Sequence, residues 1–192
     1  INKNDEIISC KNEKYLHEGI NDWEEVLMTL LTHGAFNGCA LMIPKAIFDV
    51  CGNFDEDLRY NQDSLMWMEI CLKRFKFLYI NDVLVYQRIH DGQLTQTGRK
   101  LFHHDCMIRN KKLLPKLLEV SDRNHNFLYM YAKGMAKHNN PAIVEECISE
   151  GKNVGLVKWE EVVQLKFLDA YGRIRPIIRK LYYRIFKKVK TE

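Results

Sequence analysis

The amino-acid sequence predicts an α/β (or α+β) fold over residues 1–98, followed by a helical region over residues 99–192. Two short apolar runs bounded by turn-forming residues, 39–43 and 77–80, are typical of buried strands. Beyond the second run and its loop, strand patterns fade and apolar residues recur at helical spacing instead. The mixed region therefore comes first, and the helices follow.

Composition is that of a globular protein. The 192 residues are 46% hydrophobic and 28% charged, which argues against disorder. The apolar runs are too short for a transmembrane helix, and the polar start of the chain does not fit a signal peptide. Because the first residue is Ile1 rather than Met, we expect the chain to be a piece of a longer protein.

The six cysteines are widely spaced, and no two are separated by only two residues. A disulfide-rich secreted domain would be shorter and denser in cysteine, so we expect a reducing, cytoplasmic compartment. His103, His104 and Cys106 stand close together, but no second pair at zinc spacing follows them. We interpret these three as solvated or half-buried helix residues rather than as zinc ligands.

The helices of the first half are predicted from capping residues and apolar periodicity. Asn21 and Glu24 have the spacing of a capping box and predict a helix start. Gly34 predicts the end of that helix, and Pro44 opens a second, short helix that runs through Val50. The apolar face of the first helix consists of Val26, Leu27, Leu30 and Leu31.

A buried helix and two strands are predicted next. Residues 61–74 are apolar nearly all round, as in a helix inside a core. Residues 77–80 and 83–90 predict two strands separated by a turn, with a polar loop over 91–98. The alternation in the second strand places three side chains on one face: Tyr86, Arg88 and His90.

The helical region ends in a basic tail. Residues 139–141 predict a turn between two helices, and Gly151 predicts the end of the second helix. Residues 173–192 carry eight Lys or Arg and one acid, whereas the other 172 residues carry 21 basic and 24 acidic groups. An apolar stripe at helical spacing runs through this tail: Ile174, Ile177, Ile178, Leu181, Tyr182, Ile185 and Phe186.

Two interpretations of this tail are open. Residues 173–190 can form an amphipathic helix that lies on an anionic membrane surface. Alternatively, the stripe covers the helical layer and the charges face water. Nucleic acid is not expected as a partner, because no known reader motif is present.

Residues 52–96 bring together the groups that sugar transfer requires. Inverting glycosyl transfer needs a carboxylate that deprotonates the attacking hydroxyl, and a cation that stabilises the departing diphosphate. Asp63, at a helix start, can supply the first, and Arg88 and His90 can supply the second. The plainer alternatives are that Asp63 is a helix cap, Arg88 a solvated strand residue and His90 a loop histidine.

These elements occur in an order that resembles the C-terminal half of a family 2 glycosyltransferase. The order is a strand, a short helix, a Gly-Asn-Phe-Asp-Glu loop, an Asp at a helix start, a buried Trp, and a strand with Tyr-Xaa-Arg-Xaa-His, over residues 35–97. The resemblance implies a GT-A fold and sugar transfer with inversion. It also implies that the chain is the acceptor-side half, with the donor-binding half upstream.

The resemblance assigns roles to individual residues. It implies that Asp63 is the general base, and that Trp67 lies in the helix behind it. It implies that Arg88 and His90 face the nucleotide diphosphate or its divalent metal, Mn²⁺ or Mg²⁺, and that His90 is a metal ligand. The loop that shapes the acceptor side consists of Gly52, Asn53, Phe54, Asp55 and Glu56.

The sequence departs from the family pattern beside these residues. Cys51 stands where the loop has its first Gly, Asn53 separates Gly52 from the Phe, and Gln62 replaces the acid before Asp63. Without that neighbouring carboxylate, the pKa of Asp63 need not be raised by like-charge repulsion. The Asp-Xaa-Asp triplet of the chain, Asp55-Glu56-Asp57, overlaps the acceptor-side loop. The family's metal motif belongs to the donor-binding half, so we expect residues 1–192 to be inactive alone.

We therefore expect a glycosyltransferase that works in polysaccharide or cell-surface glycan synthesis. Its partners would be a nucleoside-diphosphate sugar and a glycan or lipid-linked acceptor. We expect it to be cytoplasmic, or peripheral on the inner face of the membrane. The rival hypothesis is a non-catalytic interaction or membrane-docking module.

Overall fold

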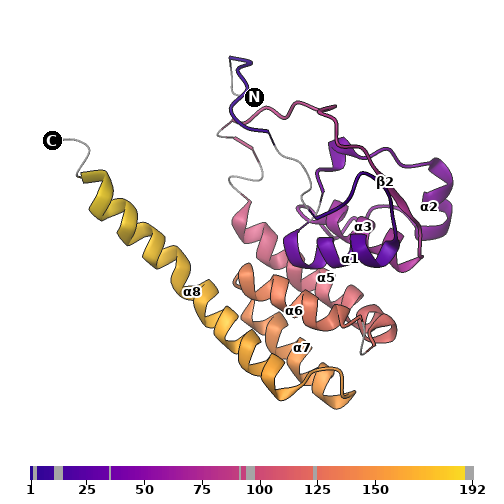
Figure 1. Cartoon of the computed structure of the whole chain (residues 1–192), viewed down its shortest axis with the longest axis vertical. Coiled ribbons are helices and arrows are strands. Elements are labelled where there is room, and N and C mark those ends of the chain that lie inside the picture. Colours follow the sequence, from indigo (N-terminus) through magenta and orange to yellow (C-terminus); the bar gives the residue numbers. More distant parts are fainter. Residues whose placement is uncertain are drawn as a thin grey trace. The chain divides into compact units, whose positions relative to one another are not determined.

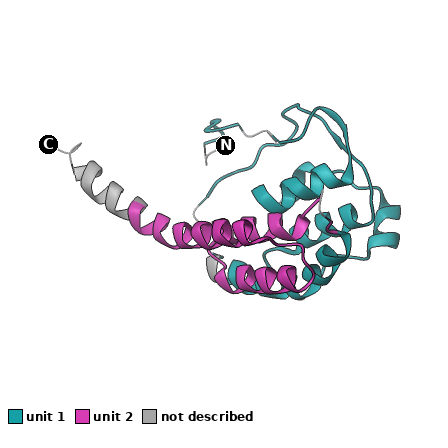
Figure 2. Ribbon diagram, turned by 60° about the horizontal axis from the view of Figure 1, so that its bottom comes forward, with its two compact units in different colours: residues 1–120 teal, residues 121–192 magenta. Residues whose placement is uncertain are grey.

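A computed structural model of the whole chain describes residues 1, 4–10, 15–34, 36–90, 92–93, 98–122 and 125–188, the last ten of these and residues 99–100 by their backbone alone. The chain forms two compact units, residues 1–120 and 121–192 (Figure 2). The expected change from mixed to helical structure after residue 98 coincides with the start of a long helix, which belongs to the first unit.

We call the first unit unit 1. Its described residues form a small sheet, four α-helices and a 3-10 helix, and Figure 1 labels the α-helices. Strand β1 pairs with strand β2 in antiparallel register, with Gly19 opposite Tyr79. In chain order the elements are β1 (Gly19–Asn21), α1 (Trp23–His33), the 3-10 helix η1 (Gly38–Ala40), α2 (Lys45–Cys51), α3 (Gln62–Leu72), β2 (Phe77–Tyr79) and α5 (Arg99–Val120).

Helix α1 begins one residue later than the sequence predicted. Asp22 is the N-cap and forms a capping box with Glu25, whose carboxylate accepts a hydrogen bond from Asp22 N at 3.4 Å. The side chain of Asn21 is occupied elsewhere, because its amide donates to the carbonyls of His17 and Gly19 at 2.8 and 3.0 Å. The predicted apolar face is confirmed, since Val26, Leu27, Leu30 and Leu31 are at most 2% exposed.

Helices α2 and α3 confirm the predictions for residues 44–50 and 61–74. Gly34 and Gly52 follow α1 and α2 with φ of 101° and 83°, values that glycine adopts at little cost. Helices α1 and α2 both pack against α3, which is therefore the centre of the core of unit 1. The buried side chains of α3 are Ser64, Leu65, Met66, Trp67, Met68, Ile70 and Cys71.

The predicted strand over residues 39–43 is wrong. That segment contains the last two residues of η1 and then an irregular stretch, in which Met42 is 98% exposed. The strand predicted over 83–90 is also absent from the described residues, where the segment is exposed. Two hydrogen bonds join this segment to the first residue: the Ile1 ammonium donates to Gln87 O at 2.8 Å, and Ile89 N donates to Ile1 O at 2.9 Å.

The physical reason for this difference lies in strand pairing. An apolar run becomes a stable strand only where neighbouring strands bind its backbone groups. The strand predicted over 77–80 is confirmed as β2, but its partner is β1 rather than the following segment. Over the described residues the chain is mostly helical, with seven α-helices and one two-stranded sheet. The expected GT-A half-fold stays a prediction.

Unit 2 consists of three helices, α6 (Phe127–Lys137), α7 (Pro141–Asn153) and α8 (Trp159–Lys188). Asn126 caps α6 by accepting a hydrogen bond from Tyr129 N at 2.9 Å. The predicted turn at 139–141 is confirmed, with Pro141 in the first turn of α7. The core of this unit includes Phe127, Leu128, Tyr131, Ala132, Ile143, Val144, Cys147, Val162 and Leu165.

The prediction that Gly151 ends a helix is wrong. Gly151 lies inside α7, where a Cβ atom would overlap Val157 and would lie 3.0 Å from Leu128 Cδ2. This glycine is therefore needed for close packing and not for a helix stop. Gly172 has the same role in α8, because a Cβ there would overlap the carbonyl oxygen of Ala136 in α6.

The structure also bears on the cysteines and on the absence of a predicted transmembrane helix. All six cysteines are free, and Cys71, Cys106 and Cys147 are buried like small apolar residues. Cys106 is thus fully buried rather than half-buried as predicted. Among the residues that the structure describes, no helix has the length and apolarity that crossing a membrane requires.

Candidate functional site

The first turn of α3 positions Asp63. The N-cap of this helix is Asn61, so Asp63 is not the cap that the plainer interpretation suggested. Asp63 lies two residues further on, and its Oδ1 accepts a hydrogen bond from Ser64 N at 2.6 Å. A carboxylate in the first turn also interacts favourably with the helix dipole. The turn therefore holds one oxygen of Asp63 and leaves Oδ2 for other contacts.

The surroundings of Asp63 include a glycine and the ring of Trp67, against which Phe54 packs. Gly38, in η1, faces the carboxylate, and a Cβ atom at this glycine would lie 3.8 Å from Asp63 Oδ2 and 3.6 Å from the Trp67 ring. The ring of Phe54 packs edge-on against Trp67 at a centroid distance of 5.9 Å. Gly38, Phe54, Asp63 and Trp67 are called the Asp63 site below. Phe54 is exposed and Trp67 is buried, so the site reaches the surface through the loop.

The environment of Asp63 raises the pKa of its carboxyl group. Burial disfavours the charged form and is the largest cause, while the Ser64 amide and the Arg109 guanidinium act in the opposite direction. The missing acid at Gln62 is therefore not needed for a raised pKa. A raised value suits a general base, because its proton affinity comes closer to that of the group it must deprotonate.

A buried polar network of α5 lies under this turn. Asp105 Oδ2 accepts hydrogen bonds from the backbone N–H groups of Tyr60 and Asn61 at 2.6 and 3.2 Å. Arg109 donates from Nη1 to Ser64 Oγ at 2.7 Å. Both charged residues are less than 5% exposed. They hold the start of α3, and hence the backbone that carries Asp63.

Asp105 and Arg109 were not among the site residues predicted from the sequence. Charged residues on a helix are usually solvated, so their types alone gave no reason to select them. One signal was available, because Asp105, Cys106 and Arg109 share one helix face with the apolar Leu113. Charged residues on the apolar face of a helix indicate a buried network.

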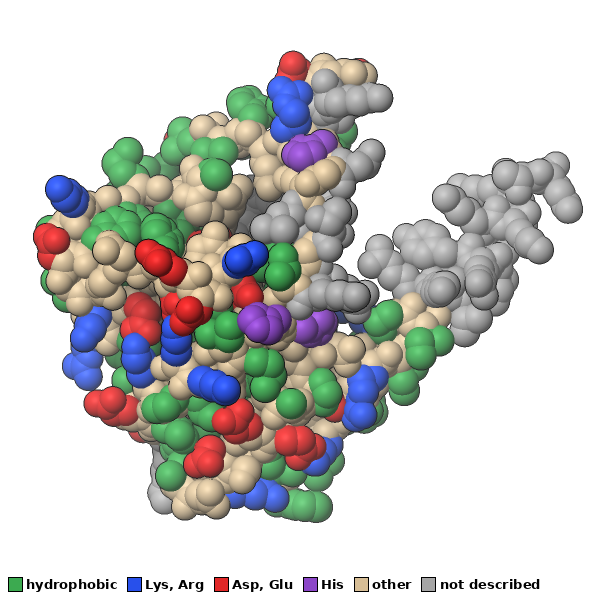
Figure 3. Space-filling view, turned by 180° about the vertical axis from the view of Figure 1, so that it is seen from behind, with side chains coloured by type: hydrophobic (Ala, Val, Ile, Leu, Met, Phe, Trp, Pro, Cys, Tyr) green, Lys and Arg blue, Asp and Glu red, His purple; other side chains and the backbone are tan. Residues whose placement is uncertain are grey.

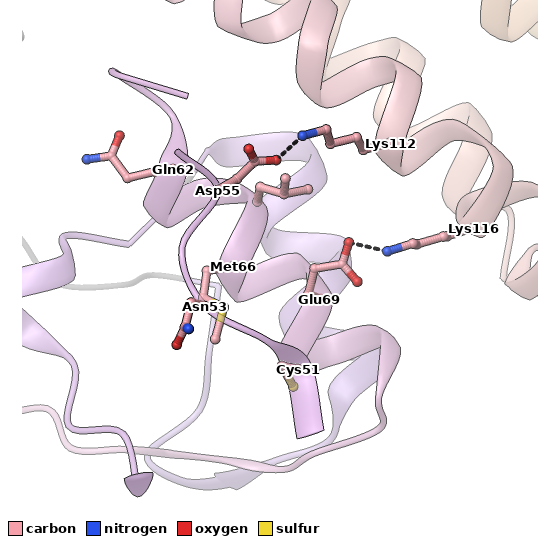
Figure 4. A pocket seen from close by; sticks show the side chains of 9 residues that line it. Cys51, Asn53, Asp55, Gln62, Met66, Glu69, Lys112 and Lys116 are labelled. Atoms are coloured by element: carbon pink, nitrogen blue, oxygen red, sulfur yellow. Dashed lines mark hydrogen bonds and ion pairs between the residues drawn. The ribbon is translucent and has the colours of Figure 1, made fainter. Parts of the chain in front are cut away.

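The predicted acceptor loop lines a pocket of about 400 Å³ beside α3 (Figure 4). Asp55 is ion-paired with Lys112 and Glu69 with Lys116, so α5 contributes both ammonium groups. The hydrogen bond from Lys112 holds the pKa of Asp55 below its usual value. The remaining lining residues are Cys51, Asn53, Gln62, Leu65 and Met66.

Gly52 and Glu56 of the predicted acceptor loop do not line this pocket. Gly52 ends α2, and Glu56 is exposed. The loop therefore contributes Phe54 to the Asp63 site and Asn53 and Asp55 to the pocket. Whether the loop binds an acceptor stays a prediction.

Arg88 and His90 lie in the exposed segment after β2. Arg88 forms an ion pair with Asp5 near the N-terminus, and the carbonyl of His90 accepts a hydrogen bond from Gln93 N at 3.2 Å. These partners differ from those of Asp63. The convergence of the three residues around a sugar therefore stays a prediction.

The described residues around His90 do not form a metal site. Over the part of the chain that the structure describes, no group of three or more His, Cys, Asp or Glu side chains is close enough to hold a metal ion. Asp91, next to His90, and residues 94–97 of the predicted polar loop lie outside that part. The described residues do not by themselves fit a divalent ion, and His90 as a ligand stays a prediction.

Two curated proteins match about half of the chain. Over 102 residues it is 31% identical to an uncharacterized glycosyltransferase of Rickettsia typhi, and over 103 residues it is 38% identical to one of Rickettsia prowazekii. Each match covers 51% of this chain and 32% of the relative, so the chain spans about a third of the length of these relatives. No protein-family model and no solved structure matches the chain. The chain is thus distantly similar, over half its length, to two proteins named as glycosyltransferases.

Proposed function

We propose that this chain is the acceptor-side part of an inverting glycosyltransferase of the family 2 type, with Asp63 as its general base. The observation that carries the proposal is the position of this carboxylate, half-buried beside Gly38 and the rings of Phe54 and Trp67. The distant similarity to two proteins named as glycosyltransferases supports the same reaction class.

The geometry of the carboxylate supports a division of roles between its two oxygens. Oδ1 is held by Ser64 N, which fixes the orientation of the group. Oδ2 faces Gly38, which has no side chain of its own, and a Cβ atom there would lie 3.8 Å from this oxygen. An acceptor hydroxyl placed there would donate its proton to Oδ2 as its oxygen attacks the anomeric carbon. The exposed ring of Phe54 offers an apolar surface for the acceptor sugar.

The departing diphosphate requires positive charge. Arg88 and His90 are the residues that we propose for this role, on the basis of the resemblance and their chemistry. A divalent Mn²⁺ or Mg²⁺ ion, when bound in the complete enzyme, would add charge to the same end of the reaction. We propose a nucleoside-diphosphate sugar as the donor and a glycan or lipid-linked acceptor, as in polysaccharide or cell-surface glycan synthesis.

The replacement of Asp63 by Asn tests the assignment of the base. In the full-length natural protein, Asp63→Asn should lower sugar transfer by about a hundredfold or more, the usual contribution of a general base. Donor binding, measured by calorimetry, should be retained because the carboxylate acts on the acceptor. Transfer is measured as nucleoside diphosphate released from a panel of nucleotide sugars with glycan acceptors.

The matched control is Asp49→Asn, which removes the same charge from an exposed position on α2. This variant should transfer sugar at the rate of the unchanged protein. Equal rates for all three proteins would overturn the assignment of Asp63. An unchanged protein that transfers no sugar with any donor would favour the interaction module instead.

A further inference from the structure

Helix α8 packs on its neighbours through one face only. Val162, Leu165, Asp169 and Gly172 are buried and follow one another at helical spacing. They face α6 and α7, and Gly172 lies directly against the backbone of Ala136. After Gly172 every described side chain of α8 is exposed. The helix therefore has a packed face over its first half and none over residues 173–178.

A second face of α8 is apolar and exposed. Trp159 and Phe167 are each 71% exposed, and Ile174 is 51% exposed. The residues of this face are spaced by three or four, so they form one stripe along the helix. We call Trp159, Val163, Phe167, Tyr171, Ile174 and Ile178 the α8 stripe.

The α8 stripe favours the membrane interpretation of the basic tail. Its described members do not cover the helical layer, because that layer contacts the opposite face of α8. The stripe also begins at Trp159, well before the basic tail. From Trp159 to Ile178 a helix rises about 30 Å at 1.5 Å per residue. A continuous exposed apolar strip of this length marks a binding surface.

Positive charge flanks the second half of this stripe. Arg173 and Arg175 are exposed on either side of Ile174, and residues 173–192 carry eight basic residues and one acid. In Figure 3, hydrophobic and basic side chains lie together on the last described turns of α8. Lys133 of α6 adds a cation beside the first half, where it lines a hollow of about 450 Å³ with Val163 and Phe167.

We propose that the α8 stripe docks on an anionic lipid surface, with the helix lying in the plane of the interface. An exposed apolar stripe flanked by basic residues is the arrangement that such interfacial helices use. A second copy of the chain would bring an equally basic tail against this one, which like-charge repulsion disfavours. The inference concerns unit 2 and does not depend on the proposed sugar transfer.

Vesicle co-sedimentation of the 192-residue chain tests this inference. The chain should pellet with vesicles that contain equal parts of phosphatidylglycerol and phosphatidylcholine, and much less with phosphatidylcholine alone. The double variant Phe167→Asp with Ile174→Asp should partition about tenfold or more weakly, because it places charges in the apolar face. Circular dichroism should show an unchanged helical content.

The matched control is the double variant Leu84→Asp with Ile80→Asp. These residues of unit 1 are 71% and 49% exposed, like the pair in the stripe, and the change in charge is the same. The control should pellet like the unchanged chain. Equal pelleting by both double variants would overturn the proposal, and so would equal binding to both kinds of vesicle. A dimer in light scattering without lipid, lost in the stripe variant, would also overturn it.

Tryptophan fluorescence gives a second measurement. Trp159 opens the stripe and is exposed, whereas Trp67 is buried in unit 1. Anionic vesicles should shift the emission to shorter wavelength as Trp159 enters the lipid interface. The shift should disappear in Trp159→Phe. A shift that persists in this variant would contradict the proposed contact.

Discussion

The two units of the chain bury their polar groups in different ways. In unit 2, three helices pack through apolar side chains, and Gly151 and Gly172 allow close approach. Its buried Asp169 pairs with Arg173 one turn further along the same helix. In unit 1, by contrast, Asp105 and Arg109 of α5 are buried and bind residues more than 40 positions away.

This difference indicates where the molecule requires a defined geometry. Apolar packing tolerates small shifts, whereas a buried charged network is stable only when its hydrogen bonds are made in one arrangement. In unit 1 that arrangement fixes the turn that carries Asp63. We infer that the buried network of unit 1 serves to hold the Asp63 site in one geometry. Unit 2, in contrast, serves to present the exposed α8 stripe. The following experiments test this contrast, in order of expected effect.

Removal of the buried carboxylate of α5 should have the largest effect. Asp105→Ala leaves the N–H groups of Tyr60 and Asn61 without their acceptor, which should lower the free energy of unfolding by about 3 kcal/mol. Urea denaturation measures this change. The control Asp82→Ala, at an exposed position, should change stability by less than about 0.5 kcal/mol. Similar values for both variants would contradict a structural network under Asp63.

Replacement of a glycine by alanine should change the stability of unit 2 more than that of unit 1. Gly172→Ala places a methyl group on the Ala136 carbonyl, so it should destabilise unit 2 by about 2 kcal/mol. Gly38→Ala meets only ordinary contacts with Asp63 and Trp67 and should change stability by less than about 0.5 kcal/mol. Thermal unfolding measures both. A loss of stability in Gly38→Ala that matches Gly172→Ala would show that the space beside Asp63 is packed.

The ion pairs around the pocket should contribute little. Lys112 is 40% exposed, so Lys112→Gln should cost about 0.5 kcal/mol at neutral pH. Because Lys112 lowers the pKa of Asp55, this contribution is present above the unfolded pKa and is lost as the pH falls through the folded pKa. Urea denaturation at several pH values measures it. A cost that is unchanged in acid would exclude the pairing with Asp55 as its source.

Helices α1 and α2 could be predicted from the sequence because local boundary signals mark their ends. Gly34, Pro44 and Gly52 act within a few residues, so they can be recognised without knowing the rest of the fold. The strands predicted over 39–43 and 83–90 lack such a local signal, and neither is present among the described residues. Their apolar runs are suited to a sheet, but a strand depends on a partner that the run itself does not specify.

The candidate site was predictable only in part. Asp63 and Phe54 were selected by their place in an ordered pattern, and they do lie beside Trp67. Asp105 and Arg109 are conspicuous only when their burial is known, because most charged helix residues face water. The exposed start of the α8 stripe was missed for a related reason, since apolar spacing alone does not distinguish a packed face from a free one.

The most direct test of the central claim is the stability of Asp63→Asn as a function of pH. Burial raises the pKa of Asp63 in the folded state, so the charged carboxylate weakens folding as the pH rises from the unfolded pKa through the folded one. Asn keeps the acceptor for Ser64 N and does not titrate. The variant should therefore equal the unchanged chain near pH 3 and be more stable than it at pH 7. A variant that is clearly less stable at pH 7 would show that this carboxylate serves the fold, and would contradict its assignment as a base.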